Sequence, residues 1–225
     1  MNALKLACFD FDQTLAAVHL YETLVHHVGS SDDHQLLQAY RDLFETEDQD
    51  ETVFGGPQRL HMLHGRLGEL HDAGLSLFVI TKGSERLVSH ALQRCGLLGF
   101  FRGITDANPK QQTVQLLMNT RFERRLRADQ AILVDDTPGN LLDACTQEEL
   151  QALVSPKAFG LFLEQSAGYA RSLWRSHFEV GVISVSGQGY CKAMLVDRAR
   201  GVTEEQLDCL ARSMATQPQS CSPYC

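Results

Sequence analysis

The chain has 225 residues, of which 44% are hydrophobic and 21% charged, and its formal net charge is −8. This length allows one large domain, or a domain with a small insertion, to bury a sizeable core. The acidic balance argues against broad binding to nucleic acid or to an anionic membrane surface, and no apolar stretch approaches the roughly 20 residues that span a bilayer. We therefore expect neither nucleic-acid nor membrane partners.

The cysteines and the start of the chain indicate the compartment. The seven cysteines are odd in number and show no paired spacing typical of a metal site, so we expect reduced thiols. The first residues lead directly into an apolar run and leave no room for a cleavable signal. A cytoplasmic location is the expectation.

Four short runs rich in Val, Ile, Leu and Phe predict buried strands, at 4–9, 75–80, 131–134 and 191–196. Helix-like stretches separate the middle runs, which is the order of elements in a parallel sheet covered on both faces. A further short strand is expected near Ile104. The fold class predicted is a three-layer α/β protein.

Local signals set the ends of the predicted helices. A helix is expected near 57–72, and the next begins after Ser84 as N-cap and stops at Cys95-Gly96. Asn108 as N-cap with Pro109 at the first helical position predicts a helix to about 119, with Lys110 in its first turn. Thr203 and Gln206 resemble a capping box that opens a last helix to about 214.

Two segments interrupt this pattern. Residues 16–56 form an excursion after the first strand, with helix-like pieces around 19–28 and 34–45 and an acidic, solvated loop at 45–51. Residues 150–190 contain no clear motif.

The most informative residues are two carboxylates at the end of the first strand. Asp10 and Asp12 follow the apolar run and are one residue apart, so an extended backbone puts both side chains on the same side. Two like charges this close require a cation between them or a proton on one of them. A second strand, 131–134, also ends in paired carboxylates, Asp135 and Asp136.

The ordered set of Asp10-x-Asp12-x-Thr14, Thr81, Lys110 and Asp135-Asp136 resembles the four motifs of the haloacid dehalogenase-like (HAD) phosphohydrolases. The resemblance covers roughly residues 4–145. It implies a Rossmann-like core with the site at the carboxyl ends of the strands.

The resemblance also implies residue roles. Asp10 is the expected nucleophile, forming an aspartyl-phosphate, and Asp12 the general acid and base. Mg²⁺ is the expected cofactor. Its expected oxygen ligands are Asp10, the main-chain carbonyl of Asp12 and Asp135, with Asp136 close by or acting through water.

Five residues are expected to bind the substrate phosphate. They are Thr14, Thr81, Lys82, Gly83 and Lys110. Lys110 follows a proline, which is less usual for the family and leaves Lys82 as a rival for its role. Asn140 stands where some members of the family carry a further acidic residue, which the Asp135-Asp136 pair makes dispensable.

Asp12 distinguishes reaction types within the family, because dehalogenases lack this second carboxylate. The resemblance thus implies a Mg²⁺-dependent phosphomonoester phosphatase acting on a phosphorylated small molecule or a phosphoprotein. Whether the chain forms a homo-oligomer is left open at this point. The alternatives are a phosphotransferase or mutase, a non-catalytic phosphate-binding regulator, and a scaffold that uses 150–190. The expected domains are a core at 1–15 and 57–214, in which 150–190 is an unassigned insertion, a small helical cap at 16–56, and a flexible tail at 215–225.

Overall fold

The computed structural model describes residues 3–45, 50–107, 109–137, 140–141, 182–183 and 191–214. Within these residues the chain forms one six-stranded sheet with the strand order β3-β2-β1-β4-β6-β5. The strands are β1 (Leu6–Phe9), β2 (Ser76–Thr81), β3 (Phe101–Asp106), β4 (Ala131–Asp135), β5 (Val182–Ile183) and β6 (Lys192–Leu195). The first five strands in this order run parallel, and β5 pairs antiparallel with β6 at the edge.

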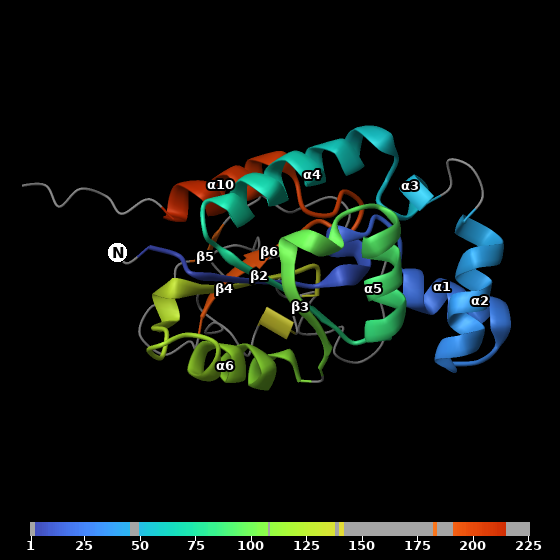
Figure 1. The fold of residues 1–225 in the computed structure, drawn as a ribbon, viewed down its shortest axis with the longest axis horizontal. Helices are drawn as coiled ribbons and strands as arrows, with labels where there is room; N and C mark the ends of the chain where they lie inside the picture. Colours follow the sequence, from blue (N-terminus) through green and yellow to red (C-terminus); the bar gives the residue numbers. More distant parts are fainter. Residues whose placement is uncertain are drawn as a thin grey trace, which may run out of the picture.

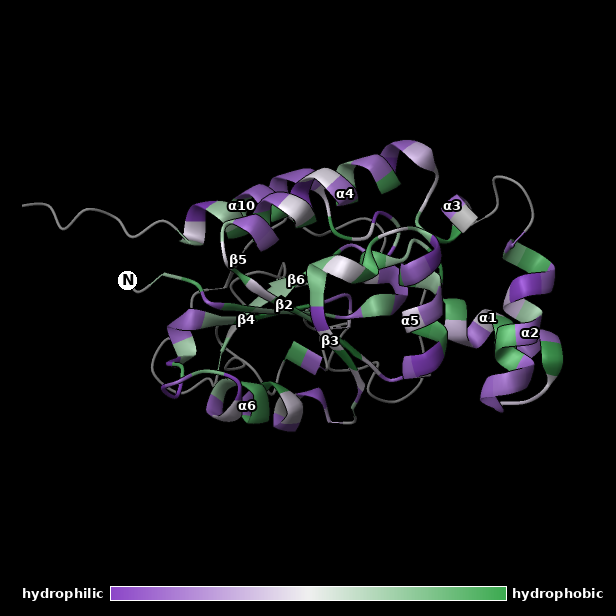
Figure 2. Cartoon of the chain, viewed as in Figure 1, coloured by the Kyte–Doolittle hydropathy of each residue, from purple (hydrophilic) through white to green (hydrophobic). Residues whose placement is uncertain are grey.

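The strands β1, β2 and β4 are buried along their whole length and consist mainly of hydrophobic residues (Figure 2). In β1, Ala7 and Phe9 belong to one core cluster, while Leu6 and Cys8 belong to the other. This two-sided burial is typical of parallel sheets, in which helices cover each face. The α/β fold class predicted from the sequence is confirmed.

Helices form the outer two layers. The pair α4 (Pro57–Asp72) and α10 (Glu204–Met214) lies along one face of the sheet, and α6 (Lys110–Thr120) covers the other (Figure 1). The helix α5 (Glu85–Arg94) packs into the same core cluster as α4 and α10. The turns Leu98–Phe100 and Ala128–Gln130 are short 3₁₀ segments.

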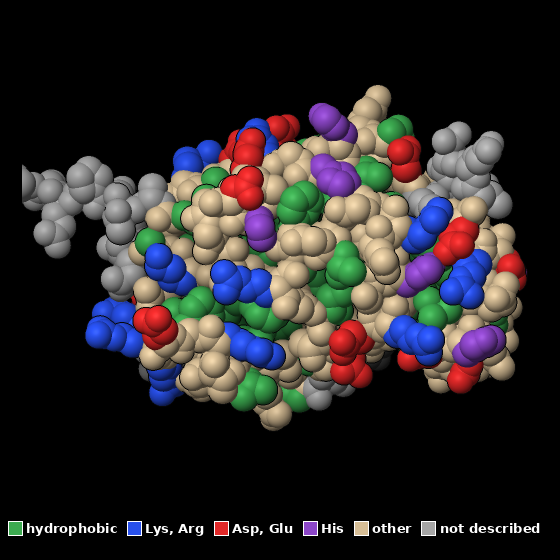
Figure 3. All heavy atoms as spheres, viewed as in Figure 1, with side chains coloured by type: hydrophobic (Ala, Val, Ile, Leu, Met, Phe, Trp, Pro, Cys, Tyr) green, Lys and Arg blue, Asp and Glu red, His purple; other side chains and the backbone are tan. Residues whose placement is uncertain are grey.

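The excursion after β1 contains three helices, α1 (Leu20–Val28), α2 (Asp33–Phe44) and α3 (Asp50–Val53), which lie at one end of the sheet (Figure 1). Charged side chains of both signs are mixed on the face of this end seen in Figure 3. The excursion leaves and rejoins the core at a narrow neck, where the Ala17 amide donates to the Val53 carbonyl at 2.8 Å.

The neck is closed by the half-buried side chain of Arg59 in α4. One terminal nitrogen of its guanidinium donates to the carbonyls of Leu15 and Phe54, both at 2.7 Å, and the other donates to Thr14 at 2.9 Å. Burial lowers the pKa of Arg59 to about 10, which leaves it charged at neutral pH. The two ends of the excursion are therefore held by one side chain.

The strand and helix positions follow the sequence closely, with three differences. The helix α6 begins at Lys110, one residue later than expected, because Pro109 is extended (ψ 145°) and precedes the helix; Asn108 lies outside the described residues. The acidic loop expected at 45–51 is shortened by α3, which begins at Asp50. The strand β5 falls within 150–190, where no element was expected.

Candidate active site

The carboxyl ends of four neighbouring strands, β2, β1, β4 and β6, meet at one edge of the sheet and border a cavity of about 630 Å³. Ligands of open α/β sheets bind at this position. The described lining residues are Asp10, Asp12, Gln13, His19, Tyr21, Glu22, Lys82, Gly83, Lys110, Asp136, Thr137, Asn140, Leu195, Val196, Asp197, Arg198 and Ala199. Six of the residues expected at the site line this cavity: Asp10, Asp12, Lys82, Gly83, Lys110 and Asp136.

A tight turn at Phe11–Leu15 presents the first two carboxylates. The Ala16 amide bonds back to the Phe11 carbonyl at 2.9 Å, and Gln13 has a positive φ of 58°. Among the described residues Gln13 is the one non-glycine residue in this left-handed region, which costs a residue with a side chain about 1–2 kcal/mol. The turn keeps both Asp10 and Asp12 at the cavity.

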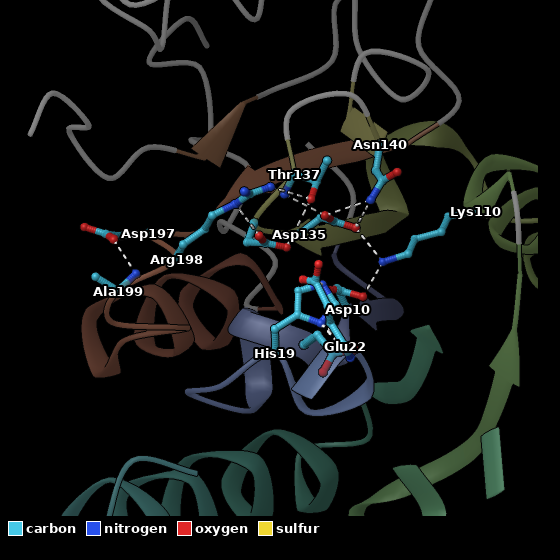
Figure 4. Close-up of polar contacts among 12 residues, drawn as sticks. Asp10, His19, Glu22, Lys110, Asp135, Thr137, Asn140, Asp197, Arg198 and Ala199 are labelled. Atoms are coloured by element: carbon cyan, nitrogen blue, oxygen red, sulfur yellow. Dashed lines mark hydrogen bonds and ion pairs between the residues drawn. The ribbon is translucent and has the colours of Figure 1, made fainter. Parts of the chain in front are cut away.

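Lys110 joins the ends of β1 and β4. Its Nζ donates to Asp10 Oδ1 and, at 2.8 Å, to Asp135 Oδ2 (Figure 4). Burial alone would lower the pKa of the ammonium, but the carboxylates of Asp10 and Asp135 outweigh burial and raise it above its ordinary value. The side chain is almost fully buried. Lys82, the rival position, is exposed at the rim of the cavity.

The paired carboxylates Asp135 and Asp136 differ in their surroundings. Asp135 is fully buried, and its oxygens accept from Lys110, from the Thr137 amide at 2.8 Å and from Asn140 Nδ2 at 3.0 Å. Asp136, in contrast, lines the cavity. The sequence interpretation gave the direct metal contact to Asp135 and a lesser part to Asp136. Of the two, the structure places Asp136 at the cavity surface, while protein donors surround the Asp135 carboxylate.

The Asp12 carboxylate lies against the start of α1. Its Oδ1 accepts from the Tyr21 amide at 3.3 Å, and its Oδ2 lies 3.8 Å from Nδ1 of His19, the residue that caps this helix. Burial raises the pKa of Asp12 above its ordinary value, although His19 and the amides of Tyr21 and Leu20 oppose the shift. A helix of the excursion thus holds the second carboxylate at the cavity.

The turn after β2 brings Lys82 and Gly83 to the cavity, but Thr81 is turned inward. The Thr81 hydroxyl is buried and accepts from the Gly83 amide at 3.0 Å. A Cβ on Gly83 would lie 3.0 Å from Cβ and Cγ of Tyr21, so glycine allows α1 to approach this turn closely.

Thr14 is placed differently from its expected role. It is fully buried and is not among the described residues that line the cavity. Its main-chain carbonyl accepts from Arg59 and from the Val202 amide, while its hydroxyl has no hydrogen-bond partner among the described residues. The geometry therefore gives Thr14 a part in the scaffold below the site and none at the cavity surface.

Arg198, in the loop after β6, was not anticipated. Its Nε lies 2.6 Å from Asp136 Oδ2, and a terminal nitrogen donates to the Thr137 hydroxyl at 3.1 Å (Figure 4). A signal was present in the sequence, since Asp197 and Arg198 directly follow the apolar run 191–196. Polar residues at a strand end are candidates for the ligand site of such a sheet.

The floor of the cavity fits a divalent cation. One oxygen from each of Asp10, Asp135 and Asp136 can be chosen so that all three lie within 4.8 Å of one another. Burial raises the pKa of Asp10 well above its ordinary value, and Asp135 and Asp136 add to the shift against the opposing charge of Lys110. Burial and Asp135 likewise raise the pKa of Asp136. A Mg²⁺ ion, which prefers carboxylate oxygens, would relieve this crowding of negative charge.

One comparison with known proteins identifies the family of this chain. The sequence matches the family of haloacid dehalogenase-like hydrolases over residues 18–151, more than half of the chain. The match begins after Asp10 and Asp12, so the case for these two residues comes from the motif and the geometry. The comparison with curated proteins gives no match. Among the described residues, no helix is both long and apolar enough to cross a membrane.

Three similar solved structures have low identity and low TM-scores. They are a haloacid dehalogenase-like hydrolase of Streptococcus pneumoniae (19% identity, TM-score 0.39, 62% of this chain and 79% of that one), a predicted phosphatase of Clostridium acetobutylicum (14%, 0.37, 64% and 81%) and the HAD domain of the effector Lem4 of Legionella pneumophila (13%, 0.40, 62% and 76%). At these TM-scores they carry no argument about chemistry.

Proposed function

The chain belongs to the haloacid dehalogenase-like hydrolase family, and from that premise we propose that it is a Mg²⁺-dependent phosphomonoester hydrolase. The observation that carries the proposal is the second carboxylate. Asp12 lines the same cavity as Asp10, and burial raises its pKa, which suits a group that must hold a proton for a leaving oxygen. Cleavage of a carbon–halogen bond needs no such proton.

The proposed reaction has two steps, both on residues of the cavity floor. In the first, the Asp10 carboxylate attacks phosphorus, a bond forms between phosphorus and the Asp10 oxygen, and the ester P–O bond breaks as Asp12 protonates the leaving oxygen. In the second, Asp12 takes a proton from water and the water oxygen bonds to phosphorus. The bond between phosphorus and the Asp10 oxygen breaks, which releases inorganic phosphate and regenerates the Asp10 carboxylate.

The remaining residues position the phosphate and offset negative charge at the site. Lys110, in contact with Asp10, offsets the charge of the nucleophile and the phosphoryl group. The amide of Gly83 is already bonded to Thr81, so Lys82, exposed at the rim, is the better candidate to meet the phosphate from the β2 side. Asp10 and Asp136 would hold Mg²⁺, with Asp135 behind them. The bound ion would supply charge neutralisation for the phosphoryl oxygens.

The experiment is phosphate release from p-nitrophenyl phosphate and a panel of phosphorylated metabolites, with Mg²⁺ or with EDTA. Wild type is compared with Asp10→Asn and Asp12→Asn. We expect Mg²⁺-dependent turnover that Asp10→Asn abolishes, and that Asp12→Asn reduces most for substrates with poor leaving groups, since these depend on the proton. Chloride release from 2-chloropropionate without phosphate release would overturn the proposal.

The same assay also distinguishes two alternative functions. A phosphotransferase would give more product when an alcohol acceptor is added and would release less free phosphate. A phosphate-binding regulator would bind inorganic phosphate with Mg²⁺ but show no turnover on any substrate, including phosphopeptides. The buried, cavity-lining Asp12 favours hydrolysis over both.

A further inference from the structure

The loop after β6 is built as a rigid turn. The Asp197 carboxylate accepts from the Ala199 amide at 2.7 Å, and the Asp197 carbonyl accepts from the amides of Arg200 and Gly201 at 3.1 and 2.8 Å. Gly201 closes the turn with a φ of 65°, a conformation that a residue with a side chain rarely adopts. Arg198 therefore projects from a turn whose own backbone is fixed on both sides of it.

Both ends of this turn are bonded to the strands and turns that carry the candidate site. The Val196 amide donates to the carbonyl of Asp135 at 3.0 Å, and the Val202 amide donates to that of Thr14 at 2.8 Å. A Cβ on Gly201 would lie 2.7 Å from the Thr14 carbonyl oxygen, which shows how closely the two segments approach. The position of Arg198 is thus set relative to both β1 and β4.

The Arg198 guanidinium, which lines the cavity, forms an ion pair with the Asp136 carboxylate. Its Nε contacts Asp136 Oδ2 at 2.6 Å, and a terminal nitrogen reaches the Thr137 hydroxyl at 3.1 Å, while that hydroxyl lies 3.3 Å from Asp136 Oδ1. The carboxylate is buried, whereas the Arg198 side chain is 37% exposed. Two neighbouring groups, one on each oxygen, thus restrict the rotation of the Asp136 side chain.

We propose that Arg198 is a positioning residue, which fixes the Asp136 carboxylate in the orientation that binds the divalent cation. This inference rests on the proposed function, because it assigns Asp136 to that cation. Residues that hydrogen-bond to metal ligands commonly contribute about 10–100-fold in metal affinity or activity. The loss of the positive charge of Arg198 would by itself have the opposite effect, because the divalent cation would no longer be repelled by the guanidinium. The sign of the effect therefore separates orientation from charge.

The test measures binding of Mn²⁺ to the full chain without substrate, from the electron paramagnetic resonance signal of the free ion. The variants are Arg198→Ala and Arg198→Lys, with Arg200→Ala, an exposed arginine of the same turn, as the matched control. We expect Kd for Mn²⁺ to rise at least tenfold in Arg198→Ala and to be unchanged in Arg200→Ala. Arg198→Lys should recover only part of the affinity, because an ammonium lacks the planar fork.

Each other outcome has a defined meaning. Unchanged or tighter Mn²⁺ binding by Arg198→Ala overturns the positioning role, and a rise in KM alone would identify Arg198 as a substrate contact instead. Denaturation midpoints in EDTA show whether a variant is folded, and Arg198→Lys keeps the test valid if the alanine variant is not. Mn²⁺ binding by a wild type without turnover would overturn the proposed function only, while absence of Mn²⁺ binding would overturn both.

Discussion

Lys110 Nζ contacts Asp10 Oδ1 and lies 2.8 Å from Asp135 Oδ2, so a single buried ammonium joins the carboxyl ends of β1 and β4. Removing it would leave two buried carboxylates without their cation, which typically costs about 3–5 kcal/mol. We expect Lys110→Met to lose that much unfolding free energy in urea denaturation with EDTA at neutral pH. The control Lys82→Met, at an exposed position of the same cavity, should unfold like wild type. Equal stability of the two variants would contradict the central role of Lys110.

The different surroundings of Asp135 and Asp136 predict different effects of the same substitution. In Asp135→Asn the new amide group would face the donors Lys110 and Asn140, so we expect a loss of about 2–3 kcal/mol in unfolding free energy. Asp136→Asn should leave stability near that of wild type and weaken Mn²⁺ binding at least tenfold. Calorimetric Mn²⁺ titration and urea denaturation measure the two effects. Stronger loss of Mn²⁺ binding in Asp135→Asn would restore the assignment made from the sequence.

The raised pKa values of Asp10, Asp12 and Asp136 make the metal-free protein sensitive to pH. Above the ordinary aspartate pKa the folded form binds more protons than the unfolded chain, so the unfolding free energy falls as pH rises through the raised values. We expect Tm in EDTA to decrease as pH rises from the ordinary aspartate range to neutral pH, and excess Mg²⁺ to stabilise more at the upper end, because it binds the deprotonated carboxylates. Asp136→Asn should flatten the slope in EDTA. A Tm in EDTA that increases over this range would contradict the raised values.

The close approach of Gly83 to Tyr21 couples the turn after β2 to the helical excursion. In Gly83→Ala the new Cβ would lie 3.0 Å from Cβ and Cγ of Tyr21, so one segment must move. Small displacements of positioning groups can reduce rates up to about 100-fold, and we expect at least a tenfold loss of kcat/KM. The double variant Gly83→Ala/Tyr21→Gly, which removes Cβ as well as the ring of Tyr21, should recover activity relative to Gly83→Ala.

The control for that cycle is Gly65→Ala. Among the described residues, no atom outside its chain neighbours and the backbone of its own helix lies within 4 Å of the position of its Cβ. It should leave kcat/KM unchanged. Additive effects of the Gly83 and Tyr21 substitutions in the double-mutant cycle would show that the contact does not matter for turnover.

The hydrogen bonds of Arg59 to three main-chain carbonyls predict that its substitution will strongly reduce stability, although Arg59 lies outside the candidate active site. Arg59→Met would leave the Leu15, Phe54 and Thr14 carbonyls without their charged donor, and hydrogen bonds to charged groups contribute about 1.5–3 kcal/mol each before relaxation. We expect a loss of about 3 kcal/mol in unfolding free energy and faster proteolysis near the neck. Arg66→Met, which removes exposed ion pairs with Glu69 and Glu204, should change neither.

The sequence was sufficient to predict those features of the fold and the site that depend on residues adjacent in the chain. Apolar runs predicted β1, β2, β4 and β6, and the carboxylates that follow two of them predicted that Asp10, Asp135 and Asp136 would lie close together. Lys110 could be placed there because its helix starts at the same edge of the sheet.

Properties set by side-chain direction could not be predicted in this way. Adjacent residues after a strand point to different sides, so the sequence could not tell whether Asp135 or Asp136 lines the cavity. For the same reason it could not show that Thr14 and Thr81 are turned inward. Arg198 depends on a contact across more than 60 residues of chain, which no local pattern contains.

The neck of the excursion has a consequence for how this protein could change over evolution. The carbonyls of Leu15 and Phe54 accept from the same nitrogen of Arg59, so these oxygens are no more than twice 2.7 Å apart. A segment whose ends nearly coincide can be lengthened, shortened or replaced without moving the strands on either side of it. Substrate choice could then diverge rapidly among descendants of this chain while Asp10, Lys110 and Asp136 kept their geometry.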